Sequence, residues 1–136
     1  SIEGIPAIAI SLNTFEKADF EFAAEFGVKL VGMVLKNGLP KGVSLNVNVP
    51  AVSPSEIRGV TITRQGKSRV VETFDKRIDP RNNIYYWMVG GMRFDEVDDQ
   101  ADCFQVSNNY VSITPIQYDL TSYKAIDELK KWDISL

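Results

Sequence analysis

The sequence predicts an α/β fold built around a single strand–helix–strand unit. Residues 5–12 form a near-continuous apolar run, as expected of a strand covered on both faces. Residues 14–37 then repeat apolar side chains at three- and four-residue steps, which is typical of a helix with one buried stripe. Residues 44–50 alternate apolar and polar side chains and end in a proline, as in a sheet strand. This order predicts a right-handed βαβ unit with parallel strands.

The strand at residues 44–50 has an unusual polar face. Its apolar residues share one face, whereas Asn46 and Asn48 lie on the other. A buried amide without partners costs about 1–3 kcal/mol. This face is therefore expected to meet either water or another polar group.

The predicted helix has signals at both ends. Asn13 is placed to cap its N-terminus, and Glu16, three residues on, completes the spacing of a capping box. Gly38 follows the last helical residue and ends the helix. Inside the helix, Gly27 and Gly32 each cost about 1 kcal/mol relative to alanine. Close packing on a sheet would explain these two glycines.

The second half of the chain carries mainly β signals. Strands are predicted at 56–71, 84–89, 102–106 and 110–115, with a turn at 79–83 between the first two. Thr121 is expected to cap a C-terminal helix whose apolar stripe ends at Trp132. Because one βαβ unit is too little for a stable parallel sheet, we expect its missing strands to come from elsewhere.

Composition excludes several classes of function. The net charge of −3 gives no overall basic field that would attract a nucleic-acid polymer. The absence of histidine excludes Ser-His and Cys-His nucleophile pairs and the usual zinc sites from this chain alone. Cys103 is the only cysteine, which fits a reducing, cytoplasmic compartment, and we expect it to be a buried, inert thiol in a strand. No apolar run is long enough to span a membrane, so no membrane partner is expected.

A set of short motifs occurs in order along nearly the whole chain. They are GIPAIAIS at 4–11, GLP at 38–40, LNVNVP at 45–50, TRQG at 63–66, RIDPR at 77–81, YYW at 85–87, YVSITP at 110–115 and DLT at 119–121. Together they resemble the C-terminal portion of the survival protein SurE family of nucleotide phosphatases. One departure is Asn109, which stands where the family usually has a glycine before the YVS motif.

The resemblance implies a Rossmann-like three-layer fold with an extended β-hairpin arm and a C-terminal helix that packs on a partner subunit. Residues 1–136 would then be the C-terminal part of a single domain. Within it, residues 1–50 would form the βαβ unit, residues 56–115 a β-rich arm and residues 119–133 the C-terminal helix. The expected assembly is a homo-oligomer, either a dimer or a tetramer.

The resemblance also implies hydrolysis of nucleoside 5′- or 3′-monophosphates with a divalent metal such as magnesium or manganese. The family holds its metal with an Asn-Asp-Asp-Gly motif and with a serine and an asparagine from later loops, beside a Ser-Gly-Thr segment. None of these elements lies in residues 1–136. We therefore expect no metal ligand and no catalytic residue in this chain, which would be inactive alone. The alternative is a non-catalytic oligomerisation or scaffold module.

Three residues are candidates for contact with the substrate's phosphate. Ser11 and Asn48 lie near the carboxyl ends of the two predicted parallel strands, where open α/β sheets bind ligands. They would support the phosphate or a metal-bound water, or else satisfy backbone groups of nearby loops. Arg64 could grip phosphate oxygens with its forked guanidinium, or belong to a solvent-exposed strand face or an ion pair between subunits.

Aromatic residues of the arm and the C-terminal helix are candidates for an oligomer interface. A two-stranded arm without a sheet behind it is marginally stable, and each aromatic side chain can bury about 150–250 Å². We therefore expect Tyr85 and Trp87 to contact another subunit, as well as Trp132 at the end of the helix. Tyr86 is a candidate platform on which a nucleotide base could stack.

Overall fold

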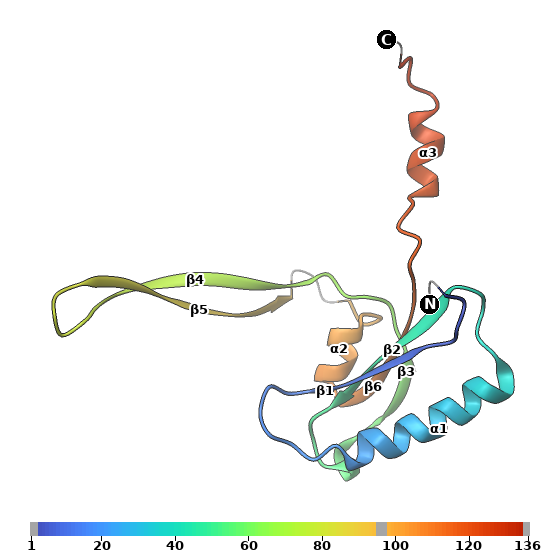
Figure 1. Ribbon diagram of the computed structural model, residues 1–136, viewed down its shortest axis with the longest axis horizontal. Coiled ribbons are helices and arrows are strands. Elements are labelled where there is room, and N and C mark those ends of the chain that lie inside the picture. Colours follow the sequence, from blue (N-terminus) through green and yellow to red (C-terminus); the bar gives the residue numbers. More distant parts are fainter. Residues whose placement is uncertain (1–2, 95–97, 135–136) are drawn as a thin grey trace.

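A parallel βαβ unit organises the fold, as the sequence predicts (Figure 1). The computed structural model describes residues 3–94 and 98–134. In it, β1 (Ile8–Asn13) pairs in parallel with β2 (Val43–Pro50), and α1 (Glu21–Asn37) connects the two strands. The predicted α/β fold class is therefore confirmed.

The helix α1 begins at Glu21, later than predicted. Asn13 is the last residue of β1, so the predicted cap and its capping box with Glu16 are wrong. The connecting segment forms tight turns instead: the Thr14 hydroxyl accepts the Glu16 N–H (3.0 Å), and the Asp19 carboxylate accepts the Glu21 N–H (2.9 Å). Threonine and aspartate side chains compete in this way with helical backbone hydrogen bonds. The helix consequently starts only after Asp19.

The sheet is completed by two strands from the same chain. β6 (Tyr110–Gln117) pairs antiparallel with β2, and β3 (Gly59–Ile62) pairs in parallel with β6, which gives the strand order β1-β2-β6-β3. The expectation that the missing strands come from elsewhere is therefore wrong for these two strands. Residues 56–115 do not form one arm either, because their two ends belong to this sheet.

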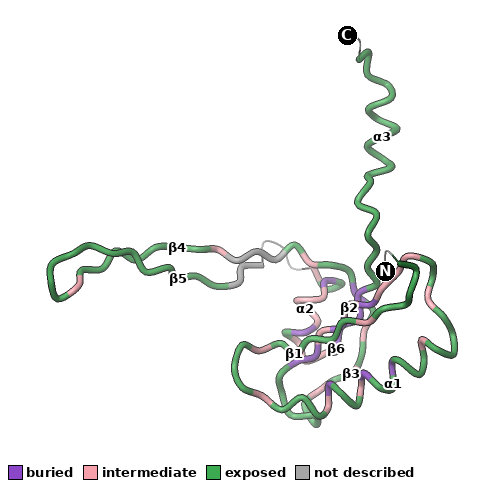
Figure 2. Tube along the Cα trace, in the orientation of Figure 1, coloured by how far each residue is buried: buried purple, intermediate pink, exposed green. Residues whose placement is uncertain are grey.

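The hydrophobic core lies between α1 and one face of the sheet (Figure 2). Its buried residues are Ala23 and Leu30 of α1, Leu45, Val47 and Val49 of β2, and Val111 and Ile113 of β6. The alternation predicted for β2 is thus confirmed. Close packing also explains Gly27, where an added Cβ would lie 2.7 Å from Ile10 Cδ1, but not Gly32, which faces open space.

The segment predicted as a strand at 102–106 is a helix, α2 (Asp102–Ser107). The Asp102 carboxylate accepts the N–H groups of Cys103 (2.7 Å) and Gly66 (2.9 Å), and an acidic residue is favourable in the first turn of a helix. Val106 is buried, and α2 packs against β6 and β2. Cys103 is half-buried in this helix rather than in a strand.

The strand predicted at 56–71 is interrupted. A 3₁₀ helix, η1 (Pro54–Glu56), precedes β3, and β4 (Ser68–Ile78) starts only after a crossing segment. In that segment the Arg64 N–H donates to the Gln100 carbonyl, and the Arg64 carbonyl accepts the N–H of Asp102, the first residue of α2. These bonds turn the chain away from the sheet and toward the arm.

The arm is a two-stranded antiparallel sheet that projects from the body (Figure 1). Its strands are β4 and β5 (Ile84–Phe94). The predicted turn at 79–83 connects them, and the Asp79 carboxylate accepts the N–H groups of Arg81 and Asn83 there, at 2.8 Å each. The Asn83 side-chain amide also donates to Asp79, at 3.0 Å. This hydrogen bond first, and then the two from backbone N–H groups, lower the pKa of Asp79.

The C-terminal helix α3 (Tyr123–Leu129) also extends away from the body, and its side chains are exposed (Figures 1 and 2). Ser122 caps it by accepting the Ala125 N–H at 3.4 Å. The predicted cap at Thr121 is therefore wrong by one residue, and the helix is shorter than expected. Across the described ranges, no helix has both the length and the apolar character needed to cross a membrane.

Candidate functional site

Four polar residues lie at one level across all four strands of the main sheet. The strand register aligns Ser11 with Asn48, Asn48 with Ser112, and Ser112 with Thr61. Side chains alternate along each strand, so these four face away from the core and from α1. We refer to them as the polar row.

The polar row changes from buried to exposed across the sheet. Ser112 is fully buried, Asn48 is half-buried and Ser11 is exposed. The Asn48 amide nitrogen lies 3.5 Å from the Ser112 hydroxyl oxygen. The polar face of β2 thus meets another polar group at Asn48, and the row opens to solvent at β1.

A second pair of hydroxyls lies on the same face of the sheet, two residues beyond Thr61 and Ser112. Thr63 Oγ1 and Thr114 Oγ1 are 2.7 Å apart, and both side chains are buried. Buried polar groups are stable when they pair in this way. The face opposite α1 is therefore polar but satisfied inside and accessible at its β1 end.

Arg64 does not join the polar row. Because β3 runs antiparallel to β2, Arg64 lies beyond Thr63 toward the amino end of β2, away from Asn48. Its guanidinium forms an ion pair with Asp98 (2.9 Å). This hydrogen bond lowers the pKa of the Asp98 carboxyl below its ordinary value. The ion pair lies within one chain, not between subunits.

The predicted aromatic residues lie on the two projecting segments. Tyr85 and Trp87 share one face of the arm and Tyr86 occupies the other, because neighbouring side chains of a strand alternate. Trp87 is 55% exposed, and the Arg77 guanidinium carbon lies 5.4 Å from its ring centroid. Trp132, after α3, is 65% exposed. None of these four aromatic residues belongs to the polar row.

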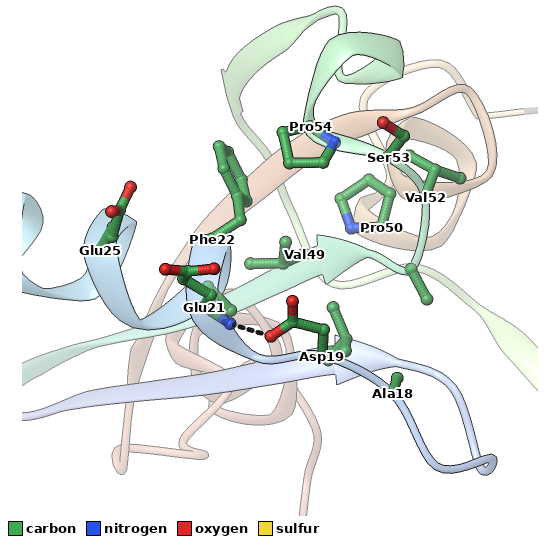
Figure 3. Close-up of a pocket in the computed structure, with 13 residues that line it drawn as sticks. Ala18, Asp19, Glu21, Phe22, Glu25, Val49, Pro50, Val52, Ser53 and Pro54 are labelled. Carbon is green, nitrogen blue, oxygen red and sulfur yellow. Dashed lines mark hydrogen bonds between the residues drawn. The ribbon is translucent and has the colours of Figure 1, made fainter.

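A cavity of about 470 Å³ lies where the carboxyl ends of β1 and β2 meet the start of α1 (Figure 3). Leu12, Val49 and Phe22 line it, together with the loop at 50–54. Sequence reasoning missed this cavity because it treated residues 14–20 as helix. The residue that could have indicated the later helix start is Asp19. It is a better helix-capping residue than its neighbours, and its carboxylate accepts the N–H of Glu21, where the helix begins.

The described residues do not fit a divalent metal ion. Across residues 3–94 and 98–134, no group of three or more histidine, cysteine, aspartate or glutamate side chains could hold one. Magnesium and manganese prefer oxygen ligands, and among these side chains aspartate and glutamate supply them. The prediction that the metal ligands lie outside this chain stays a prediction.

The fold and the polar row define a Rossmann-like α/β protein with a candidate ligand site near the carboxyl ends of its parallel strands. A family model described as "Survival protein SurE" matches residues 1–72. The chain is 44% identical over 134 residues to the 5′-nucleotidase SurE of Syntrophobacter fumaroxidans, which covers 98% of this chain and 54% of that protein. The chain belongs to the survival protein SurE family.

Other relatives agree with this assignment. The 5′-nucleotidase SurE of Nostoc sp. is 44% identical over 145 residues, covering 99% of this chain and 54% of that protein. The crystal structure of the SurE protein from Aquifex aeolicus matches with a TM-score of 0.78 and 40% identity, covering 95% of this chain and 52% of that one. The chain spans about half the length of the curated relatives it matches.

Proposed function

We propose that this chain is the C-terminal part of a nucleotidase that hydrolyses nucleoside 5′- or 3′-monophosphates to nucleoside and phosphate. The observation that carries the proposal is the identity of 44% over nearly the whole chain to proteins named 5′-nucleotidase SurE. The polar row supports it, because it approaches the carboxyl ends of parallel strands, where α/β enzymes bind substrates.

In this proposal the chain's own residues position the phosphate rather than break the bond. The Ser11 hydroxyl and the Asn48 amide can donate hydrogen bonds to phosphate oxygens or to a water beside them. Ser112 restrains the Asn48 amide, since the two side chains approach to 3.5 Å. A divalent metal, magnesium or manganese, held by residues outside this chain, would supply an activated water and neutralise phosphate charge.

We further propose that the complete protein is a cytoplasmic homo-oligomer, either a dimer or a tetramer, without nucleic-acid or membrane partners. The exposed aromatic residues Tyr85 and Trp87 of the arm, and Trp132 beyond α3, support contacts between subunits. Large apolar patches on a projecting segment are typical of interaction surfaces.

A hydrolysis assay tests this function. We expect nucleoside monophosphates to release phosphate with magnesium or manganese when this chain is joined to an upstream segment that contains an Asp-Asp pair, and not when it is alone. Activity of the isolated chain would contradict the placement of the metal ligands outside it. Activity in neither form would favour a scaffold module instead.

A further inference from the structure

The cavity at the carboxyl ends of β1 and β2 has an apolar floor and a polar rim. Leu12 and Val49 contribute the floor, and Phe22 of α1 lines one wall. Its volume of about 470 Å³ lies within the range of about 300–1,000 Å³ that is typical of small-molecule sites. An apolar, aromatic-lined cavity of this size suits a flat ring system better than a bare anion.

The 50–54 loop forms another part of the cavity lining and is stiff. Pro50 and Pro54 each fix one backbone angle. Between them, Ser53 opens η1 with a capping box, in which its backbone N–H donates to the Glu56 carboxylate (3.1 Å). The loop therefore keeps its shape without a ligand, which lowers the entropic cost of binding.

Three carboxylates line the cavity where α1 begins, those of Asp19, Glu21 and, one turn further on, Glu25. Figure 3 shows Asp19 and Glu21 beside the cavity, joined by the hydrogen bond from the Glu21 N–H to Asp19 Oδ1 (2.9 Å). This bond occupies one oxygen of Asp19, while the Glu21 side chain is exposed. At neutral pH carboxylates only accept hydrogen bonds. They therefore repel a phosphate, which offers no donor, and attract a pair of neighbouring hydroxyls, which offers two.

We propose that this cavity receives the nucleoside moiety of the substrate, with the Glu21 carboxylate, supported by Asp19, accepting hydrogen bonds from the ribose hydroxyls. The base then lies against Phe22 and the residues of the 50–54 loop. The proposal rests on the proposed nucleotidase function, for which it names the specificity determinants. The charge of the rim keeps the phosphate outside the cavity.

The position of the polar row fits this arrangement. Ser11 and Asn48 directly precede Leu12 and Val49 in the sequence, so the polar row and the cavity meet at the same end of the sheet, on its two faces. The two faces join only past the strand ends at Asn13 and Pro50, so a nucleotide whose nucleoside occupies the cavity would pass over these ends to bring its phosphate toward Ser11.

Nucleoside binding tests the proposal without requiring turnover. Calorimetry on the full-length gene product measures the affinity for adenosine, for 2′-deoxyadenosine, which lacks one ribose hydroxyl, and for inorganic phosphate. We expect Glu21→Gln to weaken adenosine binding about tenfold, as loss of a charge-assisted hydrogen bond does. The effect on 2′-deoxyadenosine, which keeps only the 3′-hydroxyl of the pair, should be clearly smaller than on adenosine, and the effect on phosphate should be under about twofold. Glu16→Gln, on the same segment but outside the cavity, should change none of these affinities.

A second variant separates a loss of nucleoside binding from a loss of folding. Val52→Trp fills the cavity from its loop, so it should abolish the binding of both nucleosides while the far-ultraviolet circular dichroism stays unchanged. Failure of the wild-type protein to bind adenosine would overturn the proposal. So would equal effects of Glu21→Gln on adenosine and 2′-deoxyadenosine. Hydroxyl-dependent adenosine binding without any hydrolysis of nucleoside monophosphates would support the nucleoside site and refute the nucleotidase function.

Discussion

Asn48 of β2 lies directly opposite Ser112 of β6, with 3.5 Å between the amide nitrogen and the hydroxyl oxygen. Ser112 is fully buried, whereas Asn48 is partly exposed. A buried acceptor thus restrains one side of an amide whose other side can reach solvent. Binding sites need side chains held in one orientation by the residues behind them, and this pair has that arrangement.

Ser112→Ala is expected to destabilise the protein by about 1 kcal/mol, because it removes the partner of the Asn48 amide in a buried setting. Urea unfolding followed by circular dichroism measures the change. Ser107→Ala is the matched control, since this exposed hydroxyl donates to the Phe104 carbonyl on α2. It should stay within about 0.5 kcal/mol of wild type. Equal effects of the two substitutions would show that the buried pair contributes nothing.

Under the proposed nucleotidase function, Asn48→Ala is expected to lower kcat/KM for nucleoside monophosphates about tenfold in the full-length gene product, because the proposal uses this amide as a donor to the phosphate. Asn37→Ala is the control, because the Asn37 side chain donates to the Met33 carbonyl at the exposed end of α1, away from the polar row. Steady-state kinetics with magnesium or manganese give both values. If Asn48→Ala kept the wild-type kcat/KM, the polar row would have no role in substrate binding.

The Asn48–Ser112 pair also marks the limit of what the sequence could predict. The alternation of β2 was readable because a strand repeats every two residues. Its pairing with β6 was not, since the partners are 64 residues apart and no local pattern specifies such a contact. Consequently Asn48 could be chosen as a site residue, while Ser112 could not.

The helix α2 shows a second limit. A short apolar stretch fits a strand or a helix equally well, and periodicity alone cannot decide between them. The choice depends here on tertiary contacts: Val106 is buried, and Asp102 bonds to Gly66, far away in the sequence. The predicted start of α1 was wrong for a local reason. The Asp19 carboxylate accepts the Glu21 N–H in a turn, and the helix begins only after this turn.

Gly66→Ala is expected to destabilise the protein by about 1–3 kcal/mol, because overpacking a filled contact costs this much. An added Cβ would lie 2.6 Å from Cys103 Sγ and 3.1 Å from Asp102 Oδ1, at the point where the arm's base meets α2. Gly91→Ala is the control, since a Cβ there meets open space. Urea unfolding of both variants decides the matter, and an unchanged midpoint for Gly66→Ala would contradict the close contact.

The ion pair between Arg64 and Asp98 is expected to make stability depend on pH. The hydrogen bond from Arg64 lowers the pKa of Asp98 in the folded state below its ordinary value of 3.8. Its contribution is therefore fully present above that value and is lost as the pH falls through the lower folded pKa. Wild type should exceed Asp98→Asn in stability near neutral pH, and the difference should shrink below about pH 4.

The control for this pH effect is Asp99→Asn, next to Asp98 on the same exposed loop. Unfolding curves collected from neutral to acid pH compare the three proteins. Asp99→Asn should follow wild type throughout. A stability difference between wild type and Asp98→Asn that stays constant through the acid range would show that the ion pair does not titrate with folding.

Trp87→Ala is expected to lower the molecular mass of the proposed homo-oligomer, because this large aromatic ring is 55% exposed on an arm without a core. Arg77 stacks on its ring and orients it on one face of β5. Light scattering coupled to size-exclusion chromatography measures the mass. Lys76→Ala, on the other face of the arm, is the control and should leave the mass unchanged. An unchanged mass for Trp87→Ala would remove the arm from the oligomer interface and leave Trp132, beyond α3, as the remaining candidate.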